Sequence, residues 1–541
     1  MPTHPELTRL VHHGLASRIW RRETSPFAAS VAPAAIHDAI RNRLGWLDAP
    51  VSMRSHIDAL EQLVEDLRQE GLTEVYLLGM GGSSLCAEVL RDVGGARDHG
   101  FRLTVLDTTD ERAVRNATDT LTPTRACFLV ASKSGSTIEV TSLERHFRQV
   151  LIKAGIEAPG RHFVAITDPG TSLVGHAEAE GYRHTFINPP DIGGRYSALS
   201  LFGLLPAALC GTPLLPLLQS GAGMADRCRR DELNNPGLEL GAFMGAHAVA
   251  GRDKLTLIVA PALAPLGPWI EQLVAESTGK TGRGILPVVG EPLGDPASYG
   301  SDRAFVAVRT SESRRERDLA ARLEAAGHPV LTIETGVEHL GAEFFRWEFA
   351  TAVAGSVIGV NPFDEPDVRG AKARTQAQLD ARATQGAFRV QPPLEPRDGL
   401  LRRESPAAAA SGTEGDRYFA VLDYLPAQPG RAEGVARARE ALRRRTGKAS
   451  THGTGPRYLH STGQYHKGGP NNGVFLLLTA ADQTATDVPG AGYTFSTLKQ
   501  AQAFGDFDAL VDAGRTVVHY HVEDPGADFT AVLERLVDQV R

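Results

Sequence analysis

Short apolar runs alternate with amphipathic-helix patterns through most of this chain, and this alternation restricts the folds that it can adopt. Parallel strands joined by crossover helices produce such a pattern, because helices then cover both faces of a sheet of buried, apolar strands. We therefore predict an α/β protein with doubly wound parallel sheets. The expected strands lie at Val75–Met80, Arg102–Asp107, Cys127–Ser132 and Phe163–Asp168 and, in a second series, at Lys254–Ala260, Ile285–Val289, Ala304–Arg309 and Val330–Glu334.

The length of the chain indicates more than one hydrophobic core. Single cores stop growing well below 541 residues, so we expect at least two domains. The two strand series predict two α/β domains, and later apolar runs predict a C-terminal α/β module that is either separate or completes the second sheet. The predicted boundaries are 1–53 for an N-terminal helical segment, 54–225 for the first domain, 226–372 for the second, 373–416 for a partly helical, then loop-like connector, and 417–541 for the module.

Charge and cysteine content argue against several classes of function. The chain has a net charge of −7, whereas proteins that bind nucleic acid or a membrane surface generally carry an excess of positive charge. Neither is therefore an expected partner. The four cysteines match neither a metal-site spacing nor a disulfide framework, and no signal peptide is visible, so we expect a cytoplasmic protein. Prolines interrupt the uncharged stretch Tyr196–Ala225, which favours a buried helix followed by a turn-rich loop over a membrane span.

Two of the predicted strands are followed by loops that are typical of anion sites. Gly79–Ser84, which includes Gly82 and Ser83, follows one strand and opens a helix. Ser132–Thr137 follows another, and it carries four hydroxyls beside Lys133. Hydroxyls and the N-terminus of a helix both suit a phosphomonoester, and ligands of such sheets gather at the carboxyl ends of the strands. The alternative for the second loop is a run of helix-capping serines.

The first loop also allows a dinucleotide site. Gly79-x-Gly81 is half of the dinucleotide fingerprint, and Asp107 ends the next predicted strand, where an acidic residue is expected. Ser84 stands where a third glycine or alanine is wanted, which disfavours an NAD-dependent dehydrogenase. A non-catalytic phosphosugar-binding regulator is another alternative, because it needs the hydroxyl loop but no catalytic carboxylate.

Two further segments carry charged groups at interpretable positions. Gly193–Ser197 places the fixed positive charge of Arg195 beside paired glycines, although an ordinary surface loop would also fit. Gln272 and Glu276 are four residues apart and so share one face of a predicted helix. A carboxylate there that faces a cleft could act as a general base, while an exposed pair is the alternative.

The segment His460–Pro470 is unusually rich in polar side chains for a connecting loop. It contains His460, His466 and a lysine among glycines. Metal binding by the two histidines lacks nearby cysteine or carboxylate ligands, so we expect no metal.

Taken together, these motifs resemble the glucose-6-phosphate isomerase family. Five of them occur in the family's order, and the resemblance spans nearly the whole chain, from about residue 40 onward. The motif sequences are most similar to the isomerase half of bifunctional transaldolase/glucose-6-phosphate isomerase proteins, although no region large enough for a transaldolase (β/α)₈ barrel precedes the motifs. The matching segments are Gly81–Ser83, Ser132–Thr137, Gly194–Ser197, Gln272–Lys280, Asn361–Asp364 leading to Lys372, Phe344–Phe349 and His460–Pro470.

The resemblance implies two doubly wound, flavodoxin-like sugar isomerase domains with a C-terminal α/β extension. It implies an aldose–ketose isomerase that converts glucose 6-phosphate and fructose 6-phosphate through an enediolate, without a cofactor, and a homodimer. It also implies roles: Glu276 as the base, Arg195 for the enediolate charge, His460 with Lys372 for ring opening, Gln272 for a sugar hydroxyl, and Gly82, Ser83, Ser132, Lys133, Ser134 and Thr137 for the phosphate.

The chain departs from the family pattern at two places. Glu365 stands where a glutamine usually precedes the late lysine by seven positions. The ring-opening histidine normally comes before that lysine, but here the matching segment follows Lys372. His460 and His466 are therefore both candidates, and we favour His460.

Overall fold

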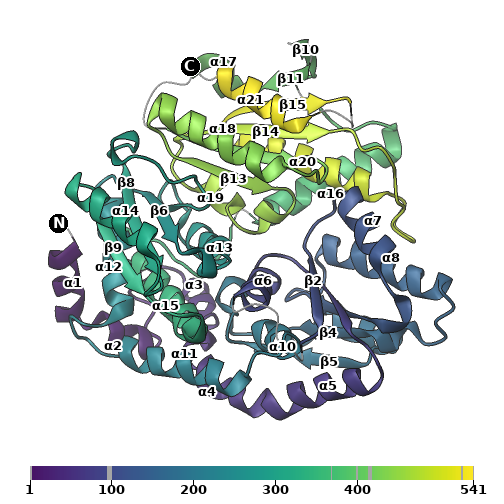
Figure 1. The fold of residues 1–541 in the computed structure, drawn as a ribbon, viewed down its shortest axis with the longest axis horizontal. Coiled ribbons are helices and arrows are strands. Elements are labelled where there is room, and N and C mark those ends of the chain that lie inside the picture. Colours follow the sequence, from purple (N-terminus) through teal and green to yellow (C-terminus); the bar gives the residue numbers. More distant parts are fainter. Residues whose placement is uncertain are drawn as a thin grey trace.

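Three sheets organise the chain in the computed structural model, which describes residues 3–93, 100–366, 368–390, 392–397, 400–411, 417–524 and 528–539 (Figure 1). The first sheet confirms the first predicted series, and all of its neighbouring strands are parallel. Its order is β2-β1-β3-β4-β5, from β1 (Glu74–Gly79), β2 (Arg102–Leu106), β3 (Ala126–Ala131), β4 (Phe163–Thr167) and β5 (His184–Ile187).

Strand β5 was not predicted, and its burial explains why. It is a four-residue edge strand in which only Phe186 is buried, so it lacks the continuous apolar run of a central strand.

The second sheet confirms the second predicted series. Its order is β7-β6-β8-β9, again with parallel neighbours. The strand order 2-1-3-4 is shared with the first sheet, and it is the doubly wound, flavodoxin-like order. The strands are β6 (Lys254–Val259), β7 (Leu286–Val288), β8 (Arg303–Arg309) and β9 (Val330–Glu334).

The C-terminal module forms a third sheet of its own and does not complete the second. Its order is β10-β11-β15-β14-β12-β13, and the four strands β12 to β15 repeat the parallel 2-1-3-4 order. The strands are β10 (Glu395–Arg397), β11 (Leu400–Glu404), β12 (Tyr418–Tyr424), β13 (Ser450–Thr454), β14 (Gly473–Ala480) and β15 (Thr516–Val522).

The loop-like part of the predicted connector differs from the structure. Strand β11 pairs antiparallel with β15. Its sequence hides this, because three of its five residues are charged, yet Arg403 is 3% exposed and its guanidinium stacks over the Phe507 ring. The connector's other end also continues as helix, since α16 (Val368–Gln385) crosses the predicted boundary after Lys372. Residues 391, 398–399 and 412–416 of this segment lie outside the described residues.

The uncharged stretch Tyr196–Ala225 forms two helices and not a helix with a turn-rich loop. Helix α10 (Leu201–Leu209) and helix α11 (Leu214–Cys228) are separated by a short turn. Pro216 lies in the first turn of α11, where a backbone N–H has no intrahelical partner to lose. Among the helices of the described residues, none has the length and apolar content needed to cross a membrane.

The remaining helices cover the sheets or join them. These helices are α1 (Thr3–His12), α2 (Leu15–Trp20), α3 (Ala34–Arg41), α4 (Ala49–Ser52), α5 (Ile57–Gln69), α6 (Leu85–Asp92), α7 (Glu111–Thr120), α8 (Ile138–Lys153), α9 (Ser172–Ala179), α12 (Pro236–Val249), α13 (Leu266–Thr278), α14 (Arg314–Ala325), α15 (Leu340–Ile358), α17 (Pro406–Ser411), α18 (Arg431–Thr446), α19 (Gly463–Gly468), α20 (Phe495–Asp512) and α21 (Phe529–Gln539). Figure 1 shows the three sheets around a common centre, where α6 and α13 lie.

Candidate active site

A cleft of about 480 Å³ lies where the carboxyl ends of β1 and β3 meet helix α13 and the segment before α19. This position agrees with the general rule that ligands of such sheets bind beyond the carboxyl ends of the strands. Ten of the eleven predicted site residues line it. They are Gly82, Ser83, Ser132, Lys133, Ser134, Thr137, Arg195, Gln272, Glu276 and His460.

Lys372 is the predicted residue that lies elsewhere. It lines a neighbouring cavity of about 180 Å³ on α16, and His460 lines both cavities. The two residues predicted to open the ring therefore line one cavity, and His460 lines the main cleft as well.

The glycines after β1 allow three chain segments to meet. A Cβ on Gly81 would lie 2.7 Å from the Gln272 amide nitrogen and 2.8 Å from the His460 carbonyl oxygen, and its φ is +56°. A Cβ on Gly82 would lie 1.9 Å from the Gly194 carbonyl oxygen. Only glycine fits such contacts, so this loop brings the Arg195 and His460 segments against the first sheet.

The dinucleotide alternative is not supported by this geometry. Asp107 is buried and accepts a hydrogen bond from Ser84 Oγ at 3.1 Å, and Arg457 lies 3.3 Å from it. The acidic residue that would hold a ribose is therefore engaged within the protein, and it lines a cleft other than that of the Ser132–Thr137 loop.

The Ser132–Thr137 loop joins β3 to the N-terminus of α8. The hydroxyls of Ser132 and Thr137 lie 3.0 Å apart, and Gly135 turns the chain with a φ of +67°. Thr137 occupies the N-cap position, but within the described part of the chain its hydroxyl makes no capping bond. The amino end of a sixteen-residue helix thus faces the loop with backbone N–H groups that suit an anion.

Two cations flank this loop. Lys133 pairs with Asp168, and burial lowers the pKa of Lys133 below its ordinary value. Arg43, from the segment after α3, lines the same cleft and donates to the Pro190 carbonyl at 3.4 Å. Arg43 was not predicted, because a single arginine in an irregular N-terminal segment carries no motif.

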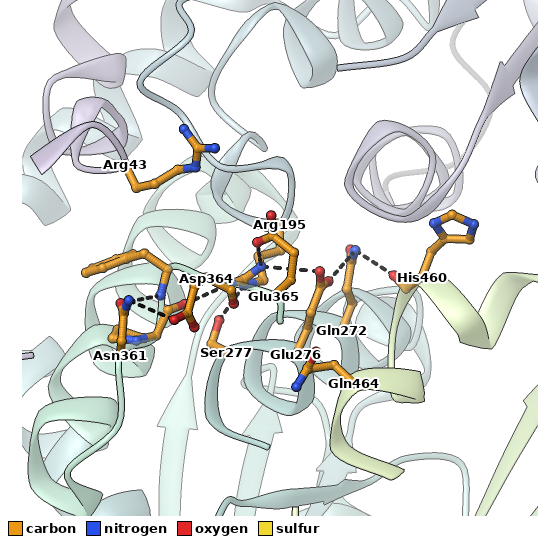
Figure 2. A network of polar contacts seen from close by, with 12 residues as sticks. Arg43, Arg195, Gln272, Glu276, Ser277, Asn361, Asp364, Glu365, His460 and Gln464 are labelled. Carbon is orange, nitrogen blue, oxygen red and sulfur yellow. Dashed lines mark hydrogen bonds and ion pairs between the residues drawn. The ribbon is translucent and has the colours of Figure 1, made fainter. Parts of the chain in front are cut away.

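Arg195 forms the densest polar network of the cleft. It is 4% exposed, and its Nη1 donates to Glu276 Oε1 at 3.2 Å and to Glu365 Oε2 at 3.1 Å (Figure 2). Its Nε donates to Ser277 Oγ at 2.8 Å, and its Nη2 donates to two backbone carbonyls of the Pro362–Asp364 segment. Burial alone would lower the pKa of Arg195, but the two carboxylates raise it above its ordinary value. The guanidinium is thus held charged and fixed.

Glu276 projects from the last turn of α13 toward Arg195. Burial raises the pKa of this carboxyl above its ordinary value; Arg195 opposes the shift, and the charge of Glu365 adds to it. A raised pKa in a cleft is typical of a carboxylate that exchanges protons near neutral pH.

Gln272 links Glu276 to the His460 backbone. Its amide nitrogen donates to Glu276 Oε2 at 3.1 Å and to the His460 carbonyl at 2.8 Å, as Figure 2 shows. The predicted role at a sugar hydroxyl stays a prediction, while these bonds assign Gln272 a position between the Glu276 carboxylate and the His460 backbone.

His460 is oriented by Glu139, which lies in the first turn of α8. His460 Nε2 lies 3.0 Å from Glu139 Oε1. Burial favours the neutral form of Glu139, but His460 outweighs it and lowers the pKa of the carboxyl below its ordinary value. Sequence analysis did not select Glu139, although its place directly after the hydroxyl loop was a usable signal.

His466 lies away from the cleft, in an aromatic cluster of the third sheet. It is 1% exposed, its Nδ1 lies 3.0 Å from the Tyr418 hydroxyl, and burial lowers its pKa well below the ordinary value. Of the two candidate histidines, the geometry favours His460.

Lys280, the last residue of the Gln272–Lys280 motif, lies beside the Arg195 network. Its Nζ donates to the Asn361 carbonyl at 2.7 Å and to Asp364 Oδ1 at 2.7 Å, and burial lowers its pKa to about 8. This lysine therefore ties the segment before Glu365 to α13. Among the described residues, no group of three or more His, Cys, Asp or Glu side chains could hold a metal ion.

Comparison with known proteins identifies the family of this chain. The family model described as phosphoglucose isomerase matches residues 52–284. The glucose-6-phosphate isomerase of Rubrobacter xylanophilus is 30% identical over 408 residues, which cover 64% of this chain and 91% of that protein. That of Symbiobacterium thermophilum is 29% identical, over 62% of this chain and 86% of its own length.

Solved structures agree with the fold. A hypothetical protein from Thermus thermophilus has a TM-score of 0.61 at 25% identity and covers 70% of this chain and 98% of its own. A glucose-6-phosphate isomerase from Chlamydia trachomatis has a TM-score of 0.52 at 19% identity, over 69% of this chain and 78% of its own. Because a curated relative shares 30% of its residues over nine-tenths of its length, this chain belongs to the glucose-6-phosphate isomerase family and is an isomerase.

Proposed function

We propose that this chain interconverts glucose 6-phosphate and fructose 6-phosphate through an enediolate, with Glu276 as the base. The observation that carries the proposal is the pairing of Glu276 with a fixed, buried Arg195 in one cleft with the Ser132–Thr137 loop. A base, a cation for the intermediate and a phosphate loop are the three elements that this reaction needs.

The hydroxyl loop would bind the phosphate. Its hydroxyls, the helix N-terminus of α8 and the cations Lys133 and Arg43 all lie at this end of the cleft. Charge-assisted hydrogen bonds to a dianion are the strong ones, so this end would anchor the substrate and set its register.

Proton transfer would then occur at the opposite end. The Glu276 carboxylate takes the proton from C2 of the open-chain aldose, the C2–H electrons form the C1–C2 double bond, and the C1 carbonyl electrons move to O1. The resulting negative charge is offset by Arg195, whose guanidinium stays protonated near neutral pH. The O2 proton then moves to O1, and the O2 electrons form the C2 carbonyl as the electrons of the C1–C2 double bond take the proton back from Glu276 to C1.

Ring opening would use His460 and Lys372. It requires a group that takes the O1 proton and a donor to the ring oxygen. Since Glu139 accepts from Nε2 of His460, the Nδ1 atom is the nitrogen left for proton transfer. Lys372, in the adjoining cavity, would donate near the ring oxygen.

The test is conversion of 2-deuterated glucose 6-phosphate by the purified chain, with and without added nucleotide. We expect turnover without nucleotide and partial loss of deuterium to solvent, because a carboxyl-held deuteron exchanges. Dependence on nucleotide, or complete transfer of the label to C1, which indicates a hydride shift, would contradict the enediolate. Absence of turnover with this pair would contradict the proposed substrates.

The family also leads us to propose a homodimer. Light scattering on the purified chain measures this directly: twice the chain mass of 57.9 kDa supports a dimer, and the single mass contradicts it.

A further inference from the structure

The Glu139 carboxylate has a second donor besides His460, and that donor comes from the C-terminal module. Gln502, on α20, donates from Nε2 to Glu139 Oε1 at 2.8 Å, while His460 Nε2 lies 3.0 Å from the same oxygen. Glu139 is 3% exposed and Gln502 is 2% exposed. Both bonds therefore form in a site from which water is largely excluded, where such bonds are strong and specific.

A third side chain determines which way the Gln502 amide points. Thr109, in the loop after β2, donates from Oγ1 to Gln502 Oε1 at 2.7 Å, and it is fully buried. Because the ionised Glu139 carboxylate can only accept, the amide NH₂ group must face it, and the amide oxygen is left to accept from the Thr109 hydroxyl. The chain of bonds Thr109–Gln502–Glu139–His460 thus has one consistent set of donors and acceptors.

This chain of bonds joins the first sheet to the third. Thr109 and Glu139 belong to the first sheet's loops and helices, whereas Gln502 and His460 belong to the C-terminal module. Helix α20 packs against α16, and Gln502 lines the same 180 Å³ cavity as Lys372 and His460. The module therefore brings Gln502 to the ring-opening residues.

We propose that Gln502 is a positioning residue for ring opening: it holds the Glu139 carboxylate in place against His460. The inference rests on the proposed function of His460. With its Nε2–H directed at a fixed carboxylate, the imidazole presents Nδ1 in one orientation. The second donor also takes part of the carboxylate's hydrogen-bonding capacity, so Glu139 draws the imidazole proton less strongly.

The main test is Gln502→Met, which keeps the shape of the side chain and removes the donor. We expect conversion of the cyclic substrate to fall about tenfold in kcat, the effect of one lost hydrogen bond, with little change in KM. 5-Deoxyfructose 6-phosphate has no free hydroxyl that can close a five- or six-membered ring, so it stays open-chain, and its conversion should change less than about twofold.

A double-mutant cycle tests whether Gln502 acts through Glu139. In a Glu139→Gln background, Gln502→Met should add no further loss, because the carboxylate that it holds is gone. Thr109→Val gives a second route that leaves Gln502 in place: it frees the amide to rotate and should reproduce part of the selective loss on cyclic substrate.

The chain offers a matched control in Gln378. This buried glutamine of α16 donates to Asp508 Oδ2 of α20 at 2.8 Å, so it has the same chemistry, and its partner lies on the helix that carries Gln502. Gln378→Met should lower the melting temperature in a similar way to Gln502→Met and leave the cyclic-to-open ratio unchanged.

The outcomes separate this inference from the proposed function. A wild-type chain that does not isomerise removes the function itself. If the wild type isomerises but Gln502→Met slows both substrate forms equally, or adds its full loss in the Glu139→Gln background, the positioning role is wrong. Should Gln502→Met not fold, Thr109→Val decides, and an unchanged ratio there also overturns the proposal.

Discussion

The two ends of the cleft are built in different ways. At the phosphate end, Ser132–Thr137 is one continuous segment at a single strand–helix junction, and Ser134 and Ser136 face solvent. At the reaction end, Arg195, Glu276 and His460 come from three separate segments, and Arg195 is almost fully buried. One end is thus a local structure, and the other exists only when three sheets pack together.

This difference has an electrostatic consequence. The hydroxyls are neutral and need only a helix terminus and nearby cations. At the reaction end, burial raises the pKa of Glu276 and the nearby Glu365 carboxylate adds to the shift, while the Arg195 guanidinium opposes it. Changes at the reaction end should therefore act mainly on kcat, and changes at the phosphate end mainly on KM.

The largest expected effect is that of Glu276→Gln. The amide keeps the shape of the side chain but cannot accept the C2 proton, so kcat should fall by at least about 10²–10⁴-fold. Steady-state kinetics on the purified variant, with circular dichroism to confirm folding, measure this. Near-normal turnover would remove Glu276 from the mechanism.

His460→Ala should give the next largest effect, and it should be selective. Conversion of cyclic substrate should slow by about 10²-fold, while the open-chain 5-deoxyfructose 6-phosphate should be spared, because Glu276 and Arg195 remain in place. His339→Ala is the matched control, since this histidine is 58% exposed on the surface. His466 is less suitable, because its removal leaves a hole in a buried aromatic cluster. Equal slowing of both substrates would contradict the assignment.

Replacing Ser132 and Thr137 together by alanine should act on binding. Each charge-assisted hydrogen bond lost should weaken affinity by about 1.5–3 kcal/mol, or roughly ten- to a hundredfold, with kcat less affected. Calorimetric titration with a 6-phosphate inhibitor measures it. Thr494→Ala is the control: Thr494 caps α20 through a bond from the Thr497 N–H, so its loss should reduce stability by about 1 kcal/mol and leave affinity unchanged. Unchanged affinity in the Ser132/Thr137 variant would return the loop to a structural role.

Glu365→Gln should give the smallest effect, and the electrostatics of Glu276 determine the direction in which the pH profile shifts. Glu276 works as a base only when ionised, so activity is lost as pH falls through its pKa. Glu365 raises that pKa, so its neutralisation should move the acid limb of kcat/KM to lower pH, by less than about one unit for a group this exposed. Turnover below neutral pH should rise. An acid limb that moves upward would show that Glu365 does not act through Glu276.

Much of the fold could be predicted from sequence because buried parallel strands are continuous apolar runs. Strands β1, β3 and β8 are buried along nearly their whole length, and their positions were predicted to within about one residue. Strand β11 was missed because Arg403 is accommodated by the Phe507 ring and by His519, neither of which is near it in sequence. A charged residue in a strand is compatible with burial only through such distant partners.

The candidate site divides in the same way. The hydroxyl loop and the Gln272–Glu276 pair were visible because each depends on local spacing along one element. Glu139, Gln502 and Arg43 were not selected, because their importance lies in what they touch across the chain. The position of His460 after Lys372 made its assignment to the site uncertain from sequence alone. In the structure, η10 (Arg457–His460) contacts η3 (Gly81–Ser83).

The sequence by itself determined the buried central strands, the doubly wound class and the loop that suits a phosphate, since these follow from periodicity and from local backbone chemistry. The tertiary structure decided which histidine reaches the cleft, which carboxylate orients it and that the pKa of Glu276 is raised. Those properties depend on burial and on charges within a few ångströms, and such neighbours are set by packing among three sheets and not by position along the chain.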